Sequence, residues 1–579
     1  MELILDEPRE RLLAANGHAL VTGGPGCGKT TIALAKAEKR IEAGLANGQS
    51  VLFLSFSRAA VGRIIEASKL QLPKHLRRCL SIQTFHSFFW EILRAYAYLL
   101  GAPHSLRLLL PHDEKVLRDG DEQEDTAWST ERQRLFMQNG LVAFDLFAPR
   151  ANELLQKSTR IRKLFTSRYP LIIVDEAQDT AEDQWQAVKL LGESSQLVCL
   201  ADLDQQIYDF RPGVSADRLK QIMEALKPEW IDLAKGNHRS PGCEIVDFGN
   251  DVLLGTPRGK KYKGVSRLYY PPAKAGRDNA IRQSVGIVFK NARKSTGENP
   301  LSIALLATWG RGVTVITRAL TGNGTPKELI PHRVVIDEAA VLLSSRIVAF
   351  LLEPRRDPDK ELLDVAEGLD LAISVCRAKG SKTSLTQATR LMAQAADARS
   401  GRAPKKIGAG YGFLTLIRQL RASGFSGDPR RDWLAVRGML RGVDKGLWSD
   451  IATAAEQLIA FQRGQRIASE LTRLWQTHGA YKGARAALDA ALAQEQLFAG
   501  ADDLRGIHVM TVHKSKAKEF DAVVLFDDPK SSPLIYCKEQ GPFRRSRRLM
   551  RVGITRAKHH VLVLSDVSDP SPLLNGHQL

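Results

Sequence analysis

The sequence has little cysteine and no long apolar stretch, and both absences narrow the classes of protein that the chain can belong to. Its 579 residues include only 6 cysteines, and no two of them form a C-x-x-C pair. This spacing argues against a zinc or iron–sulfur site, and we expect inert thiols in a reducing, cytoplasmic setting. No apolar run approaches the roughly 20 residues of a membrane-spanning helix, so we expect no membrane partner. The segment Met1–Asp6 lacks the basic start of a signal peptide.

Acidic residues are scarce relative to basic ones. Lys and Arg total 83 against 64 Asp and Glu, which gives a formal net charge of +19. Such an excess is typical of proteins that bind polyanions, although charge alone does not distinguish specific from non-specific binding of nucleic acid. The chain is also too long for a single hydrophobic core, so we expect several domains.

A glycine-rich segment predicts a nucleotide site. Residues 23–30 read Gly-Gly-Pro-Gly-Cys-Gly-Lys-Thr and fit the pattern G-x-x-x-x-G-K-S/T, with an apolar run before them and a helical pattern after them. In such a loop the backbone N–H groups cradle phosphates, Lys29 reaches the β- and γ-phosphates, and the Thr30 hydroxyl ligates Mg²⁺. The predicted nucleotide-binding residues of this segment are Gly23, Gly24, Pro25, Gly26, Cys27, Gly28, Lys29, Thr30 and Thr31.

Two adjacent carboxylates follow an apolar run further along the chain. Residues 171–179 read Leu-Ile-Ile-Val-Asp-Glu-Ala-Gln-Asp. We expect Asp175 to hold Mg²⁺ together with Thr30, and Glu176 to act as the base for an attacking water. The pair could instead cap a helix, but the apolar residues before it favour the end of a buried strand. ATP and Mg²⁺ are therefore the predicted cofactors, and hydrolysis is the predicted chemistry.

The order of apolar and helical segments predicts an α/β fold with two cores. Short apolar runs at 19–21, 51–56, 171–174 and 197–200 alternate with helical patterns, which is typical of a parallel sheet with ligand sites at its carboxyl edge. A second α/β pattern starts near residue 233, with apolar runs at 302–307 and 313–316 and its last strands near 507–526 and 560–565. The predicted segments are a first core (1–87 and 166–232), an insertion (88–165), a second core (233–354 and 504–579) and a helical insertion (355–503).

Several motifs, in order, resemble those of the superfamily 1 DNA helicases of the UvrD, Rep and PcrA type. Asp175–Asp179 matches the D-E-x-Q-D motif of that family, and residues 201–213 are similar to its G-D-x-D-Q-S-I-Y-x-W-R-G motif. The resemblance spans nearly the whole chain. It implies two RecA-like P-loop cores, each interrupted by a mainly helical insertion, and an enzyme that hydrolyses ATP to move on single-stranded or tailed duplex DNA. The family's usual direction of movement, 3′ to 5′, is part of this implication.

The resemblance also implies roles for individual residues. Gln205 would sense the γ-phosphate, and Glu519, within a segment similar to T-x-H-x-x-K-G-L-E-F, would touch the ribose. Two arginines from the second core, Arg239 in Asn-His-Arg-Ser and Arg556 in Val-Gly-Ile-Thr-Arg-Ala, would stabilise charge on the transferred phosphoryl group. The implied catalytic residues are Lys29, Asp175, Glu176, Gln205, Arg239 and Arg556.

DNA contacts are implied at four motifs. Segments 54–60 and 84–87 resemble the family's T-F-T-N-K-A-A and T-F-H-S motifs. Phe210 stands where the family usually has Trp, and an aromatic platform for bases survives that change. Taken without the family, Tyr208 and Phe210 would read as core aromatics. The implied DNA-binding residues are Phe56, Ser57, Thr84, His86, Tyr208, Phe210, Arg211, Thr511 and His513.

The chain departs from the family pattern at several positions. Arg9 stands where the family has a Gln that reads adenine, and arginine lacks the acceptor needed for that readout. Ala517-Lys518 replaces the usual Gly-Leu, Gly408–Gly412 only faintly resembles the family's duplex-contacting loop, and no aromatic hairpin follows Arg556. Translocation is therefore better supported than strand separation.

Two other functions stay open on the sequence. The chain could be an ATP-gated regulatory DNA-binding subunit with little unwinding of its own, and RNA is a third candidate substrate. No nuclease domain follows the helicase motifs, so we expect any nuclease to be a separate partner protein. DNA repair and phage defence are the pathways that the resemblance suggests.

Overall fold

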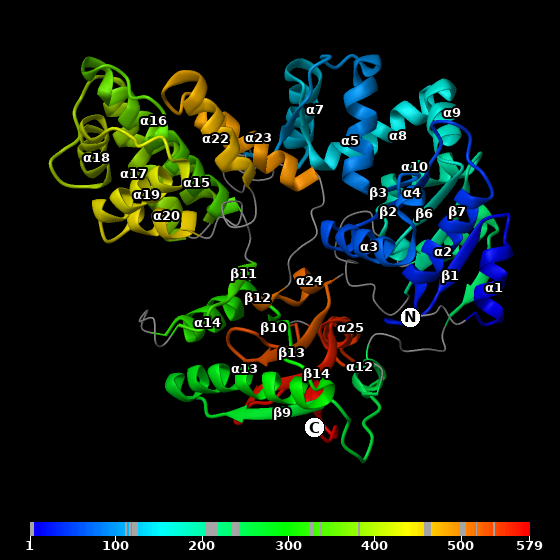
Figure 1. The fold of residues 1–579 in the computed structure, drawn as a ribbon. Coiled ribbons are helices and arrows are strands. Elements are labelled where there is room, and N and C mark those ends of the chain that lie inside the picture. Colours follow the sequence, from blue (N-terminus) through cyan, green and yellow to red (C-terminus); the bar gives the residue numbers. More distant parts are fainter. Residues whose placement is uncertain are drawn as a thin grey trace. The chain divides into compact units, whose positions relative to one another are not determined.

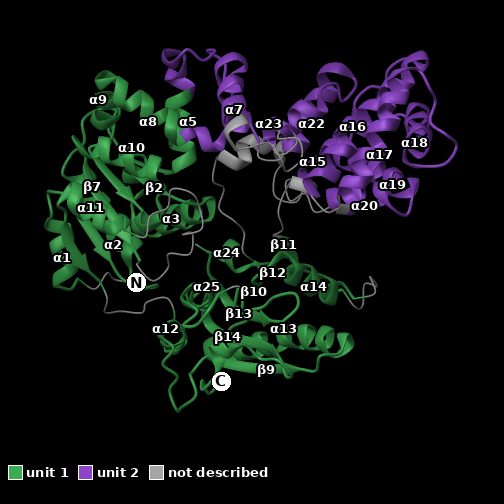
Figure 2. Ribbon diagram, turned by 180° about the vertical axis from the view of Figure 1, so that it is seen from behind, with its two compact units in different colours: residues 1–93, 148–336, 498–579 green, residues 94–147, 337–497 purple. Residues whose placement is uncertain are grey.

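The computed structural model describes most of the chain and divides it into two compact units. The described residues are 5–110, 113–114, 117, 125–202, 217–233, 240, 242–322, 329–335, 339–379, 382–456, 465–497, 505–516, 518–536 and 539–579. Unit 1 comprises residues 1–93, 148–336 and 498–579, and unit 2 comprises residues 94–147 and 337–497 (Figure 2). Unit 1 contains two sheets, which we call the first and the second sheet.

The first sheet is parallel throughout and has six strands (Figure 1). In spatial order these are β3 (Leu80–Thr84), β2 (Val51–Ser55), β6 (Leu171–Val174), β7 (Gln196–Ala201), β1 (Ala19–Thr22) and β8 (Glu229–Asp232). The helices that belong to it are α1 (Glu7–Ala14), α2 (Lys29–Glu42), α3 (Arg58–Gln71), α4 (Lys74–Arg77), α5 (Phe85–Tyr96), α8 (Phe147–Lys157), α9 (Thr159–Arg168), α10 (Glu182–Gly192) and α11 (Arg218–Leu226). Every residue of β1, β2 and β6 is buried, as expected for a parallel sheet covered on both faces.

The second sheet is also parallel and six-stranded. Its spatial order is β11 (Arg333–Val335), β12 (Gly506–Thr511), β10 (Ser302–Ala307), β13 (Phe520–Asp527), β14 (Ala557–Asp566) and β9 (Val265–Tyr270). Alternate residues of β10 face opposite layers: Ala304 and Leu306 pack in one apolar cluster with α12 (Ile245–Leu254) and α25 (Arg544–Ile554). Ile303 and Leu305 pack in another with α13 (Lys274–Thr296) and α14 (Gly310–Thr321). A short helix, α24 (Val512–Ser515), directly follows β12.

The prediction of two α/β sheets is confirmed, with one local difference. The apolar run at 302–307 is strand β10, whereas the run at 313–316 lies on helix α14. The buried residues there, Val313, Ile316 and Leu320, recur every three or four positions, which is the spacing of one helix face.

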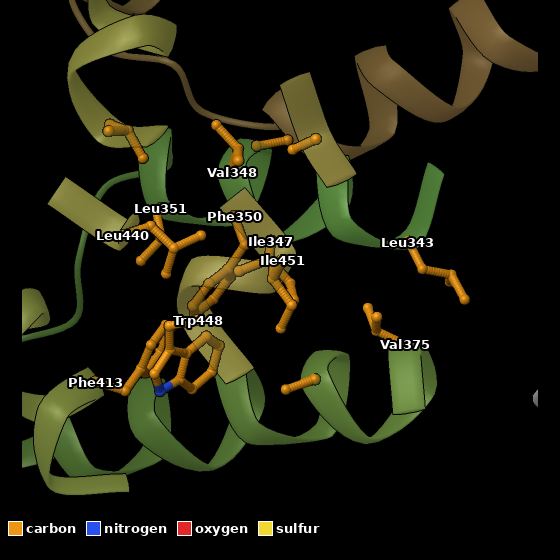
Figure 3. Packing of buried hydrophobic residues seen from close by; sticks show 14 of the residues in the cluster. Leu343, Ile347, Val348, Phe350, Leu351, Val375, Phe413, Leu440, Trp448 and Ile451 are labelled. Carbon is orange, nitrogen blue, oxygen red and sulfur yellow. The ribbon is translucent and has the colours of Figure 1, made fainter. Parts of the chain in front are cut away.

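Unit 2 is mainly helical, with one two-stranded parallel sheet. Its elements are β4 (Arg107–Leu109), α7 (Asp125–Asn139), β5 (Leu141–Ala143), α15 (Ala339–Leu352), α16 (Glu361–Lys379), α17 (Lys382–Arg399), α18 (Ala409–Ser423), α19 (Pro429–Val443), α20 (Leu447–Glu456), α22 (Gln465–His478) and α23 (Ala484–Leu497). Trp448 lies at the centre of its core, fully buried and stacked on Phe413 with ring centroids 4.4 Å apart (Figure 3). Its indole Nε1 donates a hydrogen bond to the Ala409 carbonyl at 3.0 Å, so the one polar atom of this side chain is satisfied.

Helix α15 packs in this same core, through Ile347, Val348 and Leu351. The sequence-based boundaries put residues 339–352 in the second core instead. The apolar pattern of a helix does not indicate which neighbouring element the helix packs against. In the parts of the chain described here, no helix is both long and apolar enough to cross a membrane.

Candidate nucleotide-binding and catalytic site

The glycine-rich segment forms a tight loop between strand β1 and helix α2. Gly26 and Gly28 have φ angles of 83° and 89°, a left-handed conformation that residues with a side chain rarely adopt. At Gly23, an added Cβ would lie 2.6 Å from the Cys27 sulfur. The loop therefore needs glycine at these three positions, and it delivers the chain into the first turn of α2, where unpaired backbone N–H groups attract an anion.

Lys29 is held over this loop. Its Nζ donates hydrogen bonds to the carbonyl oxygens of Gly23 and Gly24 at 2.7 and 3.0 Å. A cation is thereby fixed beside the backbone N–H groups of the loop and the positive end of the α2 dipole. This set of donors fits the phosphates of a nucleotide.

Arg9 forms a hydrogen bond with the backbone of the phosphate loop. It is buried, pairs with Asp6, and donates a hydrogen bond from Nη2 to the Cys27 carbonyl at 2.8 Å. The residue that stands in place of the family's adenine-reading Gln is thus bound to the phosphate loop.

The carboxylates Asp175 and Glu176 lie just past the carboxyl end of strand β6, as predicted. Glu176 precedes a short 3₁₀ helix, but its side chain makes no capping hydrogen bond, so the helix-cap interpretation is wrong for it. Its backbone is left-handed, with φ 53° and ψ 41°, a conformation that costs a residue with a side chain about 1–3 kcal/mol. Such strain is held only where surrounding contacts impose it.

The environment of Asp175 suits a cation. Burial, together with the neighbouring Glu176, raises the pKa of Asp175 to about 6, against the opposing effects of Arg63 and of the Ser55 hydroxyl. That hydroxyl donates to Asp175 Oδ2 at 3.1 Å. A buried carboxylate that resists ionisation gains most from a metal ion, and carboxylate and hydroxyl oxygens are ligands that Mg²⁺ accepts. Asp175 thus suits a magnesium ion, and the share of Thr30, on the first turn of α2, stays a prediction.

The pKa of Glu176 is shifted in the opposite direction to that of Asp175. Burial favours its neutral form, but the positive charges of Lys516 and Lys29 and a hydrogen bond from Gln178 hold the pKa of Glu176 below its ordinary value. Gln178 Nε2 lies 2.6 Å from Glu176 Oε2. The carboxylate is therefore ionised at neutral pH, which is the form that a general base requires.

Lys516, in the loop that follows α24, reaches these carboxylates from the second sheet. It is buried, its Nζ bonds to Asp179, and it lies 3.9 Å from Glu176 Oε2. The sequence motifs imply no role for Lys516. The signal was its place three residues after His513, in the segment where the resemblance implies DNA contacts for Thr511 and His513 and a ribose contact for Glu519.

Two further predicted residues of the second sheet lie at this same site. Arg556 is buried, its Nε donates to the Val552 carbonyl at 3.0 Å, and its charge also lowers the pKa of Glu176. Glu519 pairs with Arg63 of α3, with Oε1 and Nη1 2.9 Å apart. The ribose contact assigned to Glu519 stays a prediction.

The predicted DNA-binding residues that the structure describes lie at the carboxyl edges of both sheets. Ser57 caps α3 by accepting from the Ala60 N–H at 3.1 Å, and Thr84, at the end of β3, accepts from the Ser87 N–H at 3.0 Å. Both hydroxyls thus have a structural task at a helix start. Phe56 packs on a neighbouring ring, His86 lies on the first turn of α5, Thr511 ends β12, and His513 lies on α24 near a tyrosine hydroxyl.

Five predicted residues fall outside the described part of the chain. They are Gln205, Tyr208, Phe210, Arg211 and Arg239. Their assigned roles stay predictions, as do the DNA contacts above.

Comparison with known proteins shows similarity along most of the chain. A family model described as an AAA domain matches residues 10–211, and one described as the UvrD-like helicase C-terminal domain matches residues 464–568. The ATP-dependent DNA helicase Rep of Salmonella typhimurium is 22% identical over 611 residues, which cover 94% of this chain and 87% of Rep.

Two other relatives match in part. DNA helicase II of Haemophilus influenzae is 27% identical over 293 residues, 43% of this chain and 40% of that protein. The exonuclease/helicase subunit RexA of Lactococcus lactis is 34% identical over 106 residues, 18% of this chain and 9% of RexA. The chain thus matches less than half the length of these two relatives. Because the matched models cover the nucleotide loop at one end and the Arg556 segment at the other, and Rep aligns across the region between them, the chain belongs to the UvrD- and Rep-type superfamily 1 helicases, whose RecA-like cores carry helical insertions.

Proposed function

We propose that this protein is an ATP-dependent DNA helicase that moves along single-stranded DNA, in the 3′-to-5′ direction, by hydrolysing ATP with Mg²⁺. The observation that carries the proposal is Glu176: an ionised carboxylate next to the phosphate loop, surrounded by cations from both sheets. Relatives described as DNA helicase II and as ATP-dependent DNA helicase Rep support DNA as the substrate.

The geometry suggests how the residues share the work. Lys29 and the loop N–H groups bind and orient the phosphates, and Thr30 and Asp175 hold Mg²⁺, which would neutralise charge on the phosphate oxygens. Glu176 accepts a proton from the attacking water. Arg556 places a permanent positive charge at the same site from the second sheet, so hydrolysis changes how strongly the two sheets attract each other. DNA bound at the carboxyl edges of both sheets would then be moved as that attraction changes.

The test combines ATP hydrolysis and strand displacement on 3′-tailed, 5′-tailed and blunt duplexes. Lys29→Ala and Glu176→Gln should each lower turnover by about a hundredfold or more, since the first removes a phosphate ligand and the second the base. Lys39→Ala, on the exposed face of the same helix α2, is the matched control and should behave as the unaltered protein. Turnover within a few-fold of normal in Glu176→Gln would refute the site, and displacement of the 5′-tailed duplex alone would refute the direction.

A second function is supported by one comparison. The match to RexA, described as an exonuclease/helicase subunit, favours a chain that works as the ATP-driven subunit beside a separate nuclease. In that case single-stranded DNA stimulates hydrolysis by the isolated protein, but displacement appears only when the nuclease partner is added. Processive displacement by the isolated chain would exclude this alternative.

A further inference from the structure

Helix α25 carries five arginines, and Arg551 differs from the other four. Its side chain is only 2% exposed, whereas Arg544, Arg545, Arg547 and Arg548 are exposed or half-buried. Burying a guanidinium group is energetically unfavourable unless charged or polar groups surround it, so the surroundings of Arg551 indicate what the residue is for.

Those surroundings direct the guanidinium group toward the nucleotide site. Nε donates to Asn250 Oδ1 on α12 at 3.0 Å, which fixes the plane of the group. Nη1 lies 3.7 Å from Asp202 Oδ1, and Nη2 lies 3.8 Å from the point where a side chain on Gly24 would begin. An arginine of the second sheet therefore lies against the phosphate loop of the first.

Asp202 connects this arginine to the catalytic base. It lies one residue past strand β7, is buried, and donates from its backbone N–H to Gln178 Oε1 at 3.1 Å. Gln178 in turn donates to Glu176. Arg551 is thus connected to Glu176 through contacts with Asp202 and Gln178.

The contact between Arg551 and Asp202 is weak enough to be exchanged. At 3.7 Å it is longer than a charge-assisted hydrogen bond, which for N–H to carboxylate is about 2.7–2.9 Å. Phosphate oxygens match the planar fork of a guanidinium group, and a phosphate carries more charge than one carboxylate.

We propose that Arg551 is a further phosphate-binding residue of the nucleotide site. When a nucleotide binds, Arg551 exchanges its contact with Asp202 for a contact with the phosphates. The proposal rests on the proposed function, because it needs a nucleotide in the loop. In this proposal the partner of Arg551 depends on whether a nucleotide occupies the phosphate loop. Arg551 thereby links α25, which packs on the second sheet, to that loop.

The experiment measures equilibrium binding of a fluorescent ADP, the KM and kcat for ATP, and thermal unfolding without nucleotide. Arg551→Ala should weaken ADP binding by about tenfold or more, the usual loss for a hydrogen bond to a charged group. Arg551→Lys, which keeps the charge, should recover part of that loss. Arg544→Ala, an exposed arginine at the start of the same helix, is the matched control and should bind ADP as the unaltered protein does.

Asp202→Asn separates this role from a merely structural one. If Asp202 competes with phosphate for Arg551, its neutralisation should tighten ADP binding by about threefold, because the arginine no longer has to give up a charged partner. If the pair only holds the fold together, both Arg551→Ala and Asp202→Asn should weaken binding and lower the unfolding temperature.

Weaker ADP binding in Asp202→Asn, or ADP binding within twofold of normal in Arg551→Ala, would overturn the proposal. If Arg551→Ala does not fold, Arg551→Lys and Asp202→Asn decide the question between them. Lys29→Ala shows which idea has failed: normal ADP binding in that variant refutes the nucleotide site itself. Lost binding in Lys29→Ala beside normal binding in Arg551→Ala refutes only the role of Arg551.

Discussion

Replacing Lys516 with Met should shift the pH dependence of ATP hydrolysis and slow the reaction on the acidic side of its pH profile. Lys516 is the foremost of the groups that hold the pKa of Glu176 below its ordinary value. Methionine preserves much of the volume of the side chain but removes the charge. The pKa of Glu176 should therefore rise, and more of the enzyme should carry a protonated base that cannot accept a proton from water.

The magnitude follows from the distance between the charges. Lys516 Nζ lies 3.9 Å from Glu176 Oε2. At an effective dielectric constant of about 20, two unit charges at this separation attract by about 4 kcal/mol, which is a ceiling because Lys29 and Gln178 remain in the variant. A third of that energy raises the pKa of Glu176 by about one unit, so the acidic limb of the profile should move by about one pH unit, with a loss of about tenfold at pH values below the pKa and little change near pH 7.

The assay is DNA-stimulated ATP turnover measured across the pH range. The acidic limb of the profile should move to higher pH in Lys516→Met, and turnover should recover as the pH rises. Lys516→Met also leaves the buried Asp179 carboxylate without its lysine, which lowers stability, so Lys516→Met/Asp179→Asn is measured beside it. The double variant should regain thermal stability but keep the shifted pH profile. Lys530→Met, an exposed lysine of the same unit, is the control for loss of one surface charge.

Two results would refute this reasoning. A pH profile that does not move in Lys516→Met would mean that Lys516 does not set the ionisation of Glu176. A profile restored to normal by Asp179→Asn would mean that the charge of Asp179 next to the new methionine, and not the loss of the lysine charge at Glu176, had caused the effect.

Three other predictions follow from particular contacts. The pKa of Asp175 is about 6, against an ordinary value of 3.8, so the folded protein keeps a proton here that the unfolded chain releases between these pH values. This carboxyl therefore lowers stability as the pH rises through that window. Mg²⁺ must displace the proton, so the affinity for Mg²⁺, measured by titration, should fall about fivefold from pH 6 to pH 5. An affinity independent of pH would contradict this. Trp448→Ala should destabilise unit 2 by about 3–5 kcal/mol in urea unfolding, because it leaves a cavity beside Phe413. Gly368→Ala should also destabilise unit 2, by about 1–3 kcal/mol or more, since its new methyl carbon would lie 2.0 Å from the Phe413 ring; unchanged unfolding midpoints in either variant would contradict the packing described.

The local parts of the site could be predicted from the sequence. The glycines of the phosphate loop, Lys29 and the carboxylates after β6 are each carried by a short run of residues whose spacing has a direct geometric meaning. The strands are predictable from the sequence too, because a buried parallel strand is a short apolar run between turns. The run at 313–316 shows the limit of this reasoning, since four apolar residues are compatible with a strand or with one face of a helix.

The contacts that tune the site could not be predicted in this way. Ser55 bonds to Asp175 because β2 and β6 are neighbours in the first sheet, although the residues are 120 positions apart in the chain. Lys516 and Asp179 are separated by 337 positions. No periodicity or spacing reports such a pair, because it depends on strand order and on which side chains the folded chain brings together.

The sequence alone therefore determined the chemistry that is available: a phosphate loop, two carboxylates, an excess of positive charge and two α/β cores. Each of these depends on residues close together in the chain, so local sterics and spacing are enough. Only the tertiary structure decided that Glu176 is ionised while the pKa of Asp175 is raised, and that Arg551, out of the five arginines on one helix, lies at the nucleotide loop. The pKa shifts and contacts depend on burial and on the distances between charged groups, and the fold sets both.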